Sequence, residues 1–334
     1  MIDPGVWRGR RVLLTGHTGF KGAWLALWLA ELGAEVHGLS GPPVSEPSLY
    51  EVEDVREGLA GEHDVDVRDA DALRRAVAVA RPEVVFHLAA QAIVRRSLRE
   101  PAETFAVNVT GTAHLLEALG AEVPTVVVTS DKCYRDVASG RPMREDDALG
   151  GKDPYSASKA AQELVAAAHR ETFGAPVATA RAGNVIGGGD WAADRLVPDI
   201  FRARAANRPV VLRNPDAVRP WQHVLNPLSG YLMLAERLLA GEAADAFNFG
   251  PDRDDEQTVS WVVDRLGADA EVRPDPDADK ESPTLRLDST KARQELGWEP
   301  RWTLEQGLAA TVEWFDAFST GQAATRDQIL RFPA

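Results

Sequence analysis

Short apolar runs alternate with amphipathic stretches through the first half of this 334-residue chain. The pattern predicts strands at residues 11–15, 34–39, 62–65, 84–89, 125–130 and 176–180, and helices at residues 21–32, 70–80, 103–119 and 154–173. Strands that alternate with helices are joined by crossover connections, which produce a parallel sheet with helices on both faces. We therefore expect a doubly wound α/β fold that binds ligands beyond the carboxyl ends of its strands.

The regular alternation ends near Ala182. Beyond it, the pattern predicts helices at residues 227–239, 259–266, 289–296 and 304–318, with short strands at residues 210–212, 247–249 and 271–273. This mixture predicts a smaller mixed α/β lobe resting on the carboxyl edge of the sheet. We expect the sheet domain to span residues 1–182 and the lobe mainly residues 183–334, with the chain able to cross between them.

Composition limits the partners of the chain. A hydrophobic share of 44% and a charged share of 26% allow an ordinary core. The 37 Lys and Arg against 51 Asp and Glu give a net charge of −14, which argues against nucleic acid and anionic membranes as partners. The single cysteine, Cys133, excludes an internal disulfide and any zinc-type cysteine spacing, so no metal site is expected. With no apolar signal core in residues 1–11, we expect a cytoplasmic protein.

A glycine-rich turn follows the first predicted strand, in the run Thr15-Gly-His-Thr-Gly-Phe-Lys-Gly22, and leads into an apolar helix. Such a turn points backbone N–H groups and the positive end of the helix dipole at a pyrophosphate. Gly16 allows the tight turn, Gly19 a close approach of the ligand, and Gly22 close packing of helix on strand. A βα turn without a ligand is the alternative, but the position favours a dinucleotide site in a Rossmann-like sheet.

The acidic residue that usually binds the ribose of NAD is absent, because the second strand ends in Val36-His-Gly-Leu-Ser40. Asp66, after the third strand, is a candidate acceptor for the adenine amino group, and a helix cap is an equally good interpretation. Residues 39–44 contain no arginine to meet a 2′-phosphate, which favours NAD over NADP.

Two short runs carry the candidate chemistry. Tyr155 and Lys159 lie four residues apart in a helix that Pro154 begins, so they share one helix face. A lysine ammonium favours the tyrosine phenolate, which can accept a hydroxyl proton while hydride leaves the carbon. Alone, the pair would suit a solvated helix face.

The second run, Thr129-Ser-Asp-Lys132, follows a buried strand at the edge where doubly wound sheets bind ligands. Ser130 can hydrogen-bond the hydroxyl that Tyr155 deprotonates, and two proton-handling groups come next. A polar cap on the strand with a solvated ion pair is the alternative. The glycine turn, the end of this strand and the Tyr155 and Lys159 pair are all expected at the same edge of the sheet. Together they favour a redox site whose catalytic residues are Ser130, Asp131, Lys132, Tyr155 and Lys159.

These motifs together resemble the extended short-chain dehydrogenase/reductase family, whose signature is the glycine turn, a Ser or Thr after a central strand, and Tyr-x-x-x-Lys. Within it the chain is most similar to the CDP-glucose 4,6-dehydratases, in residues 15–22, 87–91, 129–134, 181–191 and 219–224. A weaker likeness at residues 287–292 extends the resemblance over nearly the whole chain.

The resemblance implies an internal redox dehydration of a nucleoside-diphosphate sugar with NAD as cofactor, carried out by a homodimer. Tyr155 would accept the C4 hydroxyl proton as hydride passes to NAD, Asp131 would protonate the hydroxide leaving C6, and the hydride would return to C6. The dTDP-glucose enzymes carry Glu where this chain has Lys132. Whether Lys132 removes the C5 proton or steadies an enolate therefore stays open.

The resemblance also implies which residues contact each ligand. The expected cofactor contacts are Gly16, Thr18, Gly19, Phe20, Gly22, Asp66, Val67, Ala89, Ala90 and Lys159. The expected substrate contacts are Gln91, Asn184, Arg195 and Arg219, with guanidinium groups on diphosphate oxygens and surface salt bridges as the alternative for the arginines. His223 is expected to lie in the core, as are the tryptophans Trp24, Trp28, Trp298, Trp302 and Trp314.

Three departures from the CDP-glucose pattern bear on the identity of the sugar. Residues 137–144 replace an aromatic-rich segment expected near the sugar, Asn226 stands in place of Glu, and residues 280–282 replace a His-Glu-Ala stretch. We expect them to leave the redox centre intact.

Two other functions remain open. A 4-epimerase or decarboxylase of the same fold needs Ser130, Tyr155 and Lys159 but no acid after Ser130. A non-catalytic NAD(P)-sensing protein needs neither Tyr155 nor Lys159. Asp131 with its neighbour Lys132 favours dehydration over the first function, and the Tyr155 and Lys159 pair argues against the second.

Overall fold

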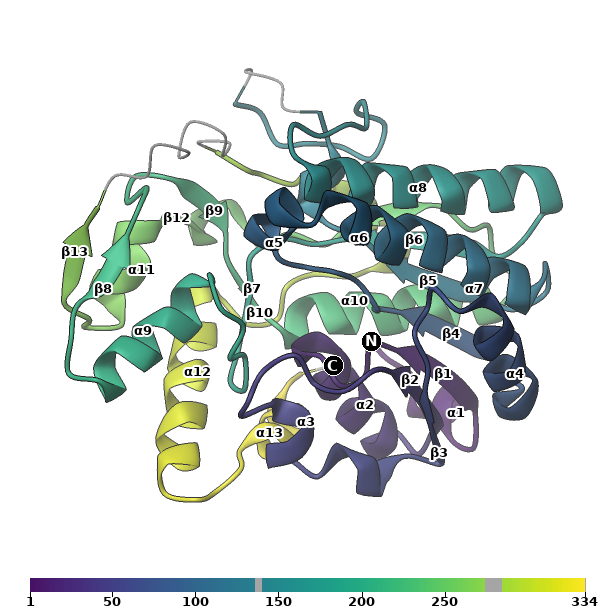
Figure 1. Ribbon diagram of the computed structural model, residues 1–334, viewed down its shortest axis with the longest axis horizontal. Helices are drawn as coiled ribbons and strands as arrows, with labels where there is room; N and C mark the ends of the chain where they lie inside the picture. The colour runs from purple at the N-terminus through teal and green to yellow at the C-terminus, as the bar shows by residue number, and fades with distance from the viewer. Residues whose placement is uncertain (136–139, 274–283, 334) are drawn as a thin grey trace.

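The computed structural model describes residues 1–135, 140–273 and 284–333. Its centre is a seven-stranded parallel sheet in the order β11-β6-β5-β4-β1-β2-β3 (Figure 1). The strands are β1 (Arg11–Thr15), β2 (Glu35–Ser40), β3 (Gly61–Asp64), β4 (Val84–His87), β5 (Thr125–Val128), β6 (Val177–Arg181) and β11 (Ala246–Asn248). The predicted doubly wound sheet is confirmed, and the strands predicted in the first half are present with only their ends shifted.

Helices cover both faces of the sheet. One face carries α2 (Phe20–Glu31) and α10 (Leu225–Leu239), and the other carries α4 (Ala70–Ala80), α7 (Gly111–Leu119) and α8 (Pro154–Phe173). Alternate residues of β1 divide between the two cores, since Leu14 packs on the α2 side and Leu13 on the α4 side. In the part of the chain that the structure describes, no helix combines the length and apolar character needed to cross a membrane.

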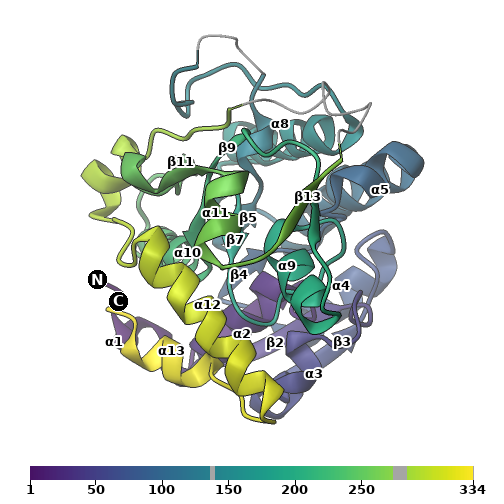
Figure 2. The same cartoon turned by 90° about the vertical axis from the view of Figure 1, so that its left-hand side faces the viewer.

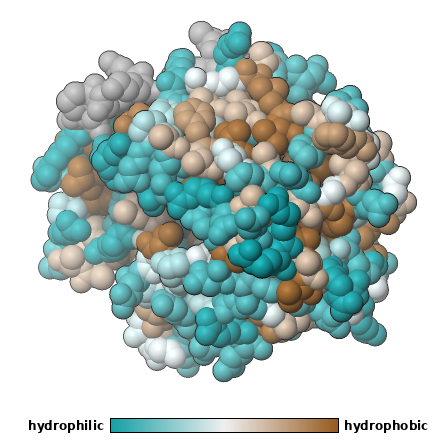
Figure 3. Space-filling model, turned by 45° about the vertical axis from the view of Figure 1, so that its right-hand side comes forward, coloured by the Kyte–Doolittle hydropathy of each residue, from teal (hydrophilic) through white to brown (hydrophobic). Residues whose placement is uncertain are grey.

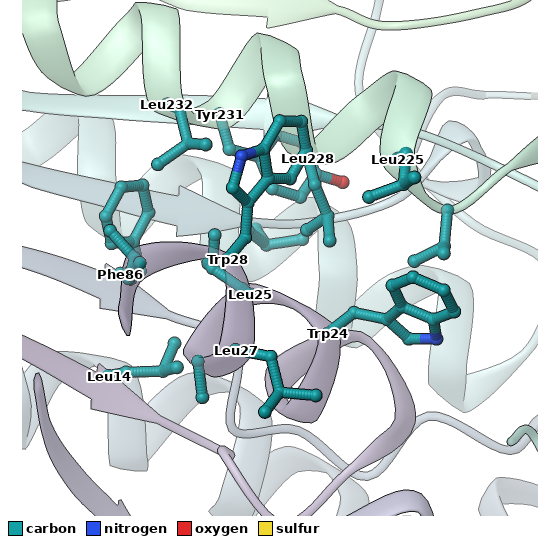
Figure 4. Close-up of a cluster of buried hydrophobic side chains, with 14 of the residues drawn as sticks. Leu14, Trp24, Leu25, Leu27, Trp28, Phe86, Leu225, Leu228, Tyr231 and Leu232 are labelled. Carbon is teal, nitrogen blue, oxygen red and sulfur yellow. The ribbon is translucent and has the colours of Figure 1, made fainter. Parts of the chain in front are cut away.

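The core between α2 and α10 is rich in aromatic side chains. Trp24, Leu25 and Trp28 of α2 lie among Leu225, Leu228, Tyr231 and Leu232 of α10 (Figure 4). His223 is fully buried, with ring centroids 5.6 Å from Trp24 and 4.8 Å from Trp302. Trp298 and Trp314 are also fully buried. The expectation for His223, Trp24, Trp28, Trp298 and Trp314 is confirmed, and Trp302 is partly buried against the same core.

The helix predicted over residues 103–119 is divided in the structure. It consists of α6 (Pro101–Phe105), a wide π turn (Ala106–Thr110) and α7. Within the π turn, Asn108 holds Gln91 through both backbone groups, at 2.8 Å and 3.1 Å, and donates to Ser158 Oγ at 2.8 Å. The wide turn thus fastens this segment to α8 and to the loop after β4.

The second lobe faces the viewer in Figure 2 and is built from short elements. Its strands are β7 (Val185–Ile186), β8 (Val210–Leu212), β9 (Val218–Pro220), β10 (Gln222–His223), β12 (Glu256–Thr258) and β13 (Ala270–Val272). Its helices are α9 (Leu196–Ala205), α11 (Val259–Arg265) and α12 (Leu304–Ser319), whereas a π turn (Ala292–Leu296) packs against α10. Shorter helices elsewhere are α1 (Pro4–Trp7), α3 (Leu49–Val52), α5 (Val94–Arg99) and α13 (Thr325–Arg331).

One strand expected in the lobe, at residues 247–249, belongs to the main sheet instead. It is β11, which pairs in parallel with β6, and α10 packs against β6 and its neighbour β5. The chain therefore crosses back from the lobe to the sheet before it enters the lobe again at β12. The run Ala246-Phe-Asn-Phe249 is entirely buried, as is typical of a strand in a sheet that is covered on both faces. So short a run does not indicate, from sequence alone, which of the two sheets it joins.

Candidate active site

A cavity of about 1510 Å³ lies at the carboxyl edge of the sheet and is lined by residues of both lobes. Typical small-molecule sites occupy roughly 300–1,000 Å³, so this cavity has room for two ligands side by side. Every residue that the sequence predicted to be catalytic, cofactor-binding or substrate-binding lies in its lining. The structure thus brings together side chains from position 16 to position 219.

The glycine turn has the close packing that a dinucleotide site requires. Gly16 has a φ of +77°, and a Cβ there would lie 2.7 Å from the backbone nitrogen of Ala89. A Cβ at Gly22 would lie 2.0 Å from the carbonyl oxygen of Gly16. Gly19 is the N-cap of α2, and no side chain of the described residues caps it. The first amides of α2 therefore face the cavity without a side-chain acceptor.

Asp66 lies in the cavity lining but does not cap a helix. The cap of α4 is Asp69, whose Oδ1 accepts from the backbone N–H of Ala72 at 2.9 Å. The cap interpretation of Asp66 is therefore wrong. Its carboxylate accepts from the backbone N–H and the Nε of Arg68, each at 2.9 Å, and these bonds lower the pKa of Asp66.

The end of β5 places three candidate catalytic side chains in contact. Ser130 Oγ donates to Asp131 Oδ1 at 2.9 Å and accepts from the backbone N–H of Lys132 at 3.2 Å. Tyr155 of α8 lines the same cavity and lies close enough to Ser130 for the serine to lower its pKa. Strand β5 ends here because the chain turns into a short 3₁₀ helix, Asp131–Cys133. Ser130, Asp131 and Tyr155 are all buried, so their hydrogen bonds are shielded from bulk water.

Gly183 makes the position of Asp131 possible. A Cβ at Gly183 would lie 2.0 Å from Asp131 Oδ2, so only glycine leaves room for this carboxylate. Oδ2 is buried and has no hydrogen-bond partner among the described residues. The oxygen is thus available to a group that enters the cavity.

Helix α8 presents Tyr155 and Lys159 to the same cavity. Burial raises the pKa of Tyr155 to about 12, and the nearby Ser130 side chain acts in the opposite direction. Burial and the nearby ammonium of Lys21 lower the pKa of Lys159 to about 7. Lys159 Nζ donates to Gln162 Oε1 at 2.8 Å and to the carbonyl of Val128 at 3.2 Å. The Lys159 amine, with a pKa lowered toward neutrality, is therefore held on the face of α8 that carries the tyrosine.

A family model described as GDP-mannose 4,6 dehydratase matches residues 13–311. The chain belongs to the GDP-mannose 4,6-dehydratase family. The chain is 46% identical to a CDP-glucose 4,6-dehydratase from Salmonella typhimurium, over 96% of this chain and 95% of that protein. It is 27% identical to a dTDP-glucose 4,6-dehydratase from Xanthomonas campestris, over 91% and 92% of the two chains. The resemblance to extended short-chain dehydrogenases/reductases is confirmed.

Solved structures within this fold include both dehydratases and epimerases. A double mutant of a dTDP-glucose 4,6-dehydratase from Streptomyces venezuelae with NAD bound superposes with a TM-score of 0.80 and 28% identity, covering 92% of this chain and 97% of that one. A UDP-glucose 4-epimerase from Thermotoga maritima with UDP-glucose also gives 0.80, with 27% identity and coverages of 92% and 99%. The fold alone therefore does not separate the two activities.

Two charged residues of the site were missed in the sequence. Lys21 lies in the cavity lining, where burial and the charge of Arg195 lower its pKa to about 8 while Asp131 and Asp190 act in the opposite direction. Asp190 is buried, and its Oδ2 is 3.1 Å from the Nη1 of Arg195. Both residues lie in glycine-rich turns, between Gly19 and Gly22 and directly after the triple glycine at 187–189, which is the signal that could have found them.

The predicted substrate contacts differ in how their side chains are engaged. Arg219 on β9 is buried and donates from Nη1 to the carbonyl of Val218 at 2.9 Å. Asn184 takes a left-handed backbone conformation with a φ of +45° at the cavity wall. The side-chain amide of Gln91 is hydrogen-bonded to protein groups, since its Nε2 donates to Thr104 Oγ1 at 2.9 Å. The Gln91 Oε1 accepts from a backbone N–H two residues on, at 2.7 Å.

The departures from the family pattern do not all reach the cavity. Asn226 is fully buried under the C-terminal segment, where its Oδ1 accepts from the backbone N–H groups of Arg301 and Trp302 at 3.0 Å and 3.1 Å. The expectation that Asn226 bears on the sugar is wrong, because its amide joins α10 to that segment. Gly140, Arg141 and Met143 line the cavity. Residues 137–139 and 280–282 lie outside the described residues.

Proposed function

We propose that this chain is a nucleotide-sugar 4,6-dehydratase with CDP-glucose as its substrate. The observation that carries the proposal is the buried Asp131 carboxylate, which accepts from Ser130 Oγ in the cavity that Tyr155 also lines. A base and an acid are thus available to two positions of the same sugar. The 46% identity to a CDP-glucose 4,6-dehydratase supports the choice of nucleotide.

The residues of the first lobe fit NAD. At Gly16 and Gly22 the backbone packs too closely for a Cβ, which keeps the turn tight, and the uncapped start of α2 supplies amides for a pyrophosphate. At the end of β2, Thr18 Oγ1 lies 2.8 Å from Ser40 Oγ, where small hydroxyls replace the usual acid. Asp66 would meet the adenine side, and Val67, Ala89 and Ala90 would complete the wall. When bound, NAD supplies the acceptor and later the donor of the hydride exchanged with the sugar.

The chain's own residues handle the protons. Tyr155 takes the proton of the C4 hydroxyl, with Lys159 stabilising the phenolate and Ser130 in contact with the same hydroxyl. Once C4 is a ketone, the C5 hydrogen is acidic, and Lys132 is the nearby group to take it or to steady the enolate. Asp131 protonates the hydroxyl that leaves C6 as water.

The arginines of the second lobe suit the diphosphate. Arg195 and Arg219 both line the cavity, and guanidinium groups match phosphate oxygens. Asn184 would offer its side-chain amide to a phosphate or sugar oxygen. For Gln91, whose amide is held by Thr104, the contact with substrate would be through packing. These local cations offset the net charge of −14 that would otherwise repel a nucleotide.

An epimerase is the second candidate, because a UDP-glucose 4-epimerase superposes equally well. Epimerisation uses the tyrosine and lysine but changes nothing at C6. It therefore has no leaving hydroxyl for Asp131 to protonate. An NAD(P)-sensing protein would use neither Tyr155 nor Lys159. The buried Asp131 in contact with Ser130 therefore favours dehydration over both.

Incubation of the purified protein with NAD and a panel of nucleoside-diphosphate glucoses tests the proposal. CDP-glucose should give a product lighter by one water, a 4-keto-6-deoxy sugar detectable by mass spectrometry. A product of unchanged mass with an inverted C4 would identify an epimerase instead. Reversible binding of NAD with no sugar product from the panel would point to a sensor.

Asp131→Asn should separate the two halves of the reaction. Without the acid, water loss should slow by about 10²–10⁴-fold while the first oxidation continues, so reduced cofactor and 4-keto sugar accumulate. Stopped-flow absorbance of the reduced cofactor measures both steps. Unimpaired turnover would remove Asp131 from the mechanism.

We also propose a homodimer in the cytoplasm, without nucleic acid or membrane partners. Large apolar side chains are exposed on α5, α6 and α8, namely Leu98, Phe105, Leu164 and Phe173. Figure 3 shows brown hydrophobic surface in the upper part of its view. Light scattering should give about twice the chain mass of 36.2 kDa. For the lobes, we propose the division at residue 182 with α10 and β11 returned to the sheet domain.

A further inference from the structure

Two carbonyl oxygens hold the amine of Lys159. Its Nζ donates at 2.8 Å to Oε1 of Gln162, three residues further along α8, and at 3.2 Å to the backbone carbonyl of Val128. Lys159 is 3% exposed and Gln162 is fully buried, so bulk water has little access to these bonds. A protonated lysine has three N–H groups, and the described residues accept two of them. The third is available to a ligand in the cavity that Lys159 lines.

Buried hydrogen bonds behind Gln162 fix which end of its amide faces Lys159. Thr112 Oγ1 has one proton and donates it to the carbonyl of Asn108 at 2.7 Å, so this oxygen can only accept from its other neighbours. Gln162 Nε2 lies 2.8 Å from it and must be the donor there. The amide oxygen of Gln162 is therefore turned toward Lys159. A flipped amide would oppose two donors at one contact and two acceptors at the other.

The same oxygen of Thr112 fixes the tautomer of His87. His87 Nε2 lies 2.9 Å from Thr112 Oγ1 and must carry the proton of that contact. Its Nδ1 then accepts from Thr15 Oγ1 at 2.7 Å, and this hydroxyl accepts from the backbone N–H of Ala89 at 3.1 Å. The side chains of Thr15, His87 and Thr112 are all fully buried. Gln162 is thus one end of an oriented set of hydrogen bonds that is anchored on β1 and β4.

The titratable groups around Lys159 come from four parts of the fold, namely Lys21 on α2, His87 on β4, Cys133 after β5, and Tyr155 and Glu163 on α8. Burial lowers the pKa of Lys159 most and, with the ammonium of Lys21, brings it to about 7, whereas Glu163 and Cys133 act in the opposite direction. His87 is neutral, because burial and the charge of Lys159 lower its pKa to about 3. Since the pKa of Lys159 lies near neutrality, one hydrogen bond decides how much of this amine is charged near pH 7.

We propose that Gln162 is a positioning residue that holds the Lys159 amine in place and favours its charged form. An ammonium donates a stronger hydrogen bond to an amide oxygen than a neutral amine does, so the oriented carbonyl stabilises the cation. A charged Lys159 in turn favours the phenolate of Tyr155 during oxidation at C4. Gln162 does not line the cavity, so it acts only through the lysine. This role in oxidation rests on the proposed dehydratase function.

Competitive acetylation of the purified protein measures the charge of Lys159 directly. Only the neutral amine reacts with a trace of acetic anhydride, so peptide mass spectrometry at a series of pH values reports its protonation, with Lys291 outside the cavity as internal reference. Gln162→Met keeps the size of the side chain but removes the acceptor, so the Lys159 profile should move to lower pH by about one unit. Gln162→Glu places a carboxylate beside the amine and should move the profile to higher pH. The two variants test the proposal in opposite directions, so either one suffices if the other does not fold.

Single-turnover reduction of NAD by CDP-glucose measures the consequence for oxidation. Gln162→Met should slow this step about tenfold at about pH 7, with the KM for CDP-glucose within about twofold of wild type. Gln328→Met is the matched control, because Gln328 is also fully buried and its Nε2 donates to the carbonyl of Ala310 at 2.8 Å. This control should change neither the Lys159 profile nor the rate of oxidation.

A Lys159 profile in Gln162→Met that coincides with the profile of wild type would overturn the proposal, as would a shift to lower pH in Gln162→Glu. Equal losses of oxidation in Gln162→Met and Gln328→Met would show that Gln162 is only structural. A wild-type protein that makes no 4-keto-6-deoxy sugar but gives both predicted shifts would contradict the proposed function, while confirming that Gln162 favours the charged lysine.

Discussion

A single missing side chain at Gly183 decides where the acid of this site can lie. A Cβ there would approach Asp131 Oδ2 to 2.0 Å, so Gly183→Ala should displace the carboxylate from Ser130. Water elimination should then fall by about 10²-fold, as expected for a misplaced general acid, while oxidation at C4 persists. Pre-steady-state kinetics with CDP-glucose measures both steps.

Gly58→Ala is the matched control, because its Cβ would lie 3.7 Å from that of Ala30, an ordinary contact. This variant should keep both rates. Normal water elimination in Gly183→Ala would show that the position of Asp131 does not limit the reaction.

At the scale of residues, the sequence predicts groups that follow strands and helix starts. Ser130 and Asp131 were found because they end a buried apolar run, and Tyr155 because Pro154 begins a helix. Lys21 and Asp190 were missed although each stands beside glycines, because a charge at such a position is usually solvated and only the fold brings the two into one cavity. Asn226 was misjudged because the sequence does not distinguish an asparagine whose amide joins two buried segments from one that contacts a ligand.

A buried ion pair fixes helix α8 to strand β6. Arg181 Nη2 lies 2.8 Å from Glu163 Oε2, and both side chains are under 5% exposed. Glu163→Gln should lower the free energy of unfolding by about 3–5 kcal/mol, because it leaves the arginine charge buried without its partner. Urea unfolding measures the change.

Adding Arg181→Met to Glu163→Gln should recover part of this loss, since both buried charges are then removed. Glu305→Gln serves as the exposed control, because the pair of Glu305 with Arg265 is about half exposed, and it should stay within about 1 kcal/mol of wild type. A Glu163→Gln variant as stable as this control would mean that the ion pair does not hold α8 in place.

At the scale of elements, the periodic strands and long helices were predictable, and interruptions and short strands were not. The π turn in residues 106–110 follows from Asn108 holding the backbone of Gln91, a contact between segments that periodicity cannot detect. Strand β11 has only three residues, and its pairing with β6 joins segments that are far apart in the sequence. Local pattern identifies an element, and tertiary packing decides its partner.

The stability of the whole molecule should fall in acid because two histidines are buried without charge. Burial lowers the pKa of His87 and of His223 to about 3, against an ordinary value near 6.5. The unfolded chain therefore binds more protons than the folded chain between about pH 6.5 and pH 3. The free energy of unfolding is therefore undiminished by these histidines above about pH 6.5, and it decreases as the pH falls from about 6.5 toward about 3.

Urea unfolding at about pH 7 and about pH 5 should show this loss in wild type. His223→Phe keeps an aromatic ring between Trp24 and Trp302 but cannot bind a proton, so its stability should fall less between the two pH values. An equal fall in both proteins would show that His223 does not contribute to the acid sensitivity.

At the scale of the whole molecule, the central claim is that both lobes line one cavity that holds a single sugar. The hydride removed from C4 is therefore kept in the site and returned to C6 of the same sugar. The most direct measurement is conversion of CDP-glucose deuterated at C4, with the product analysed by mass spectrometry and NMR. The account predicts a 4-keto-6-deoxy product that carries the deuterium on C6. A product without deuterium at C6, or deuterium retained at an inverted C4, would contradict it.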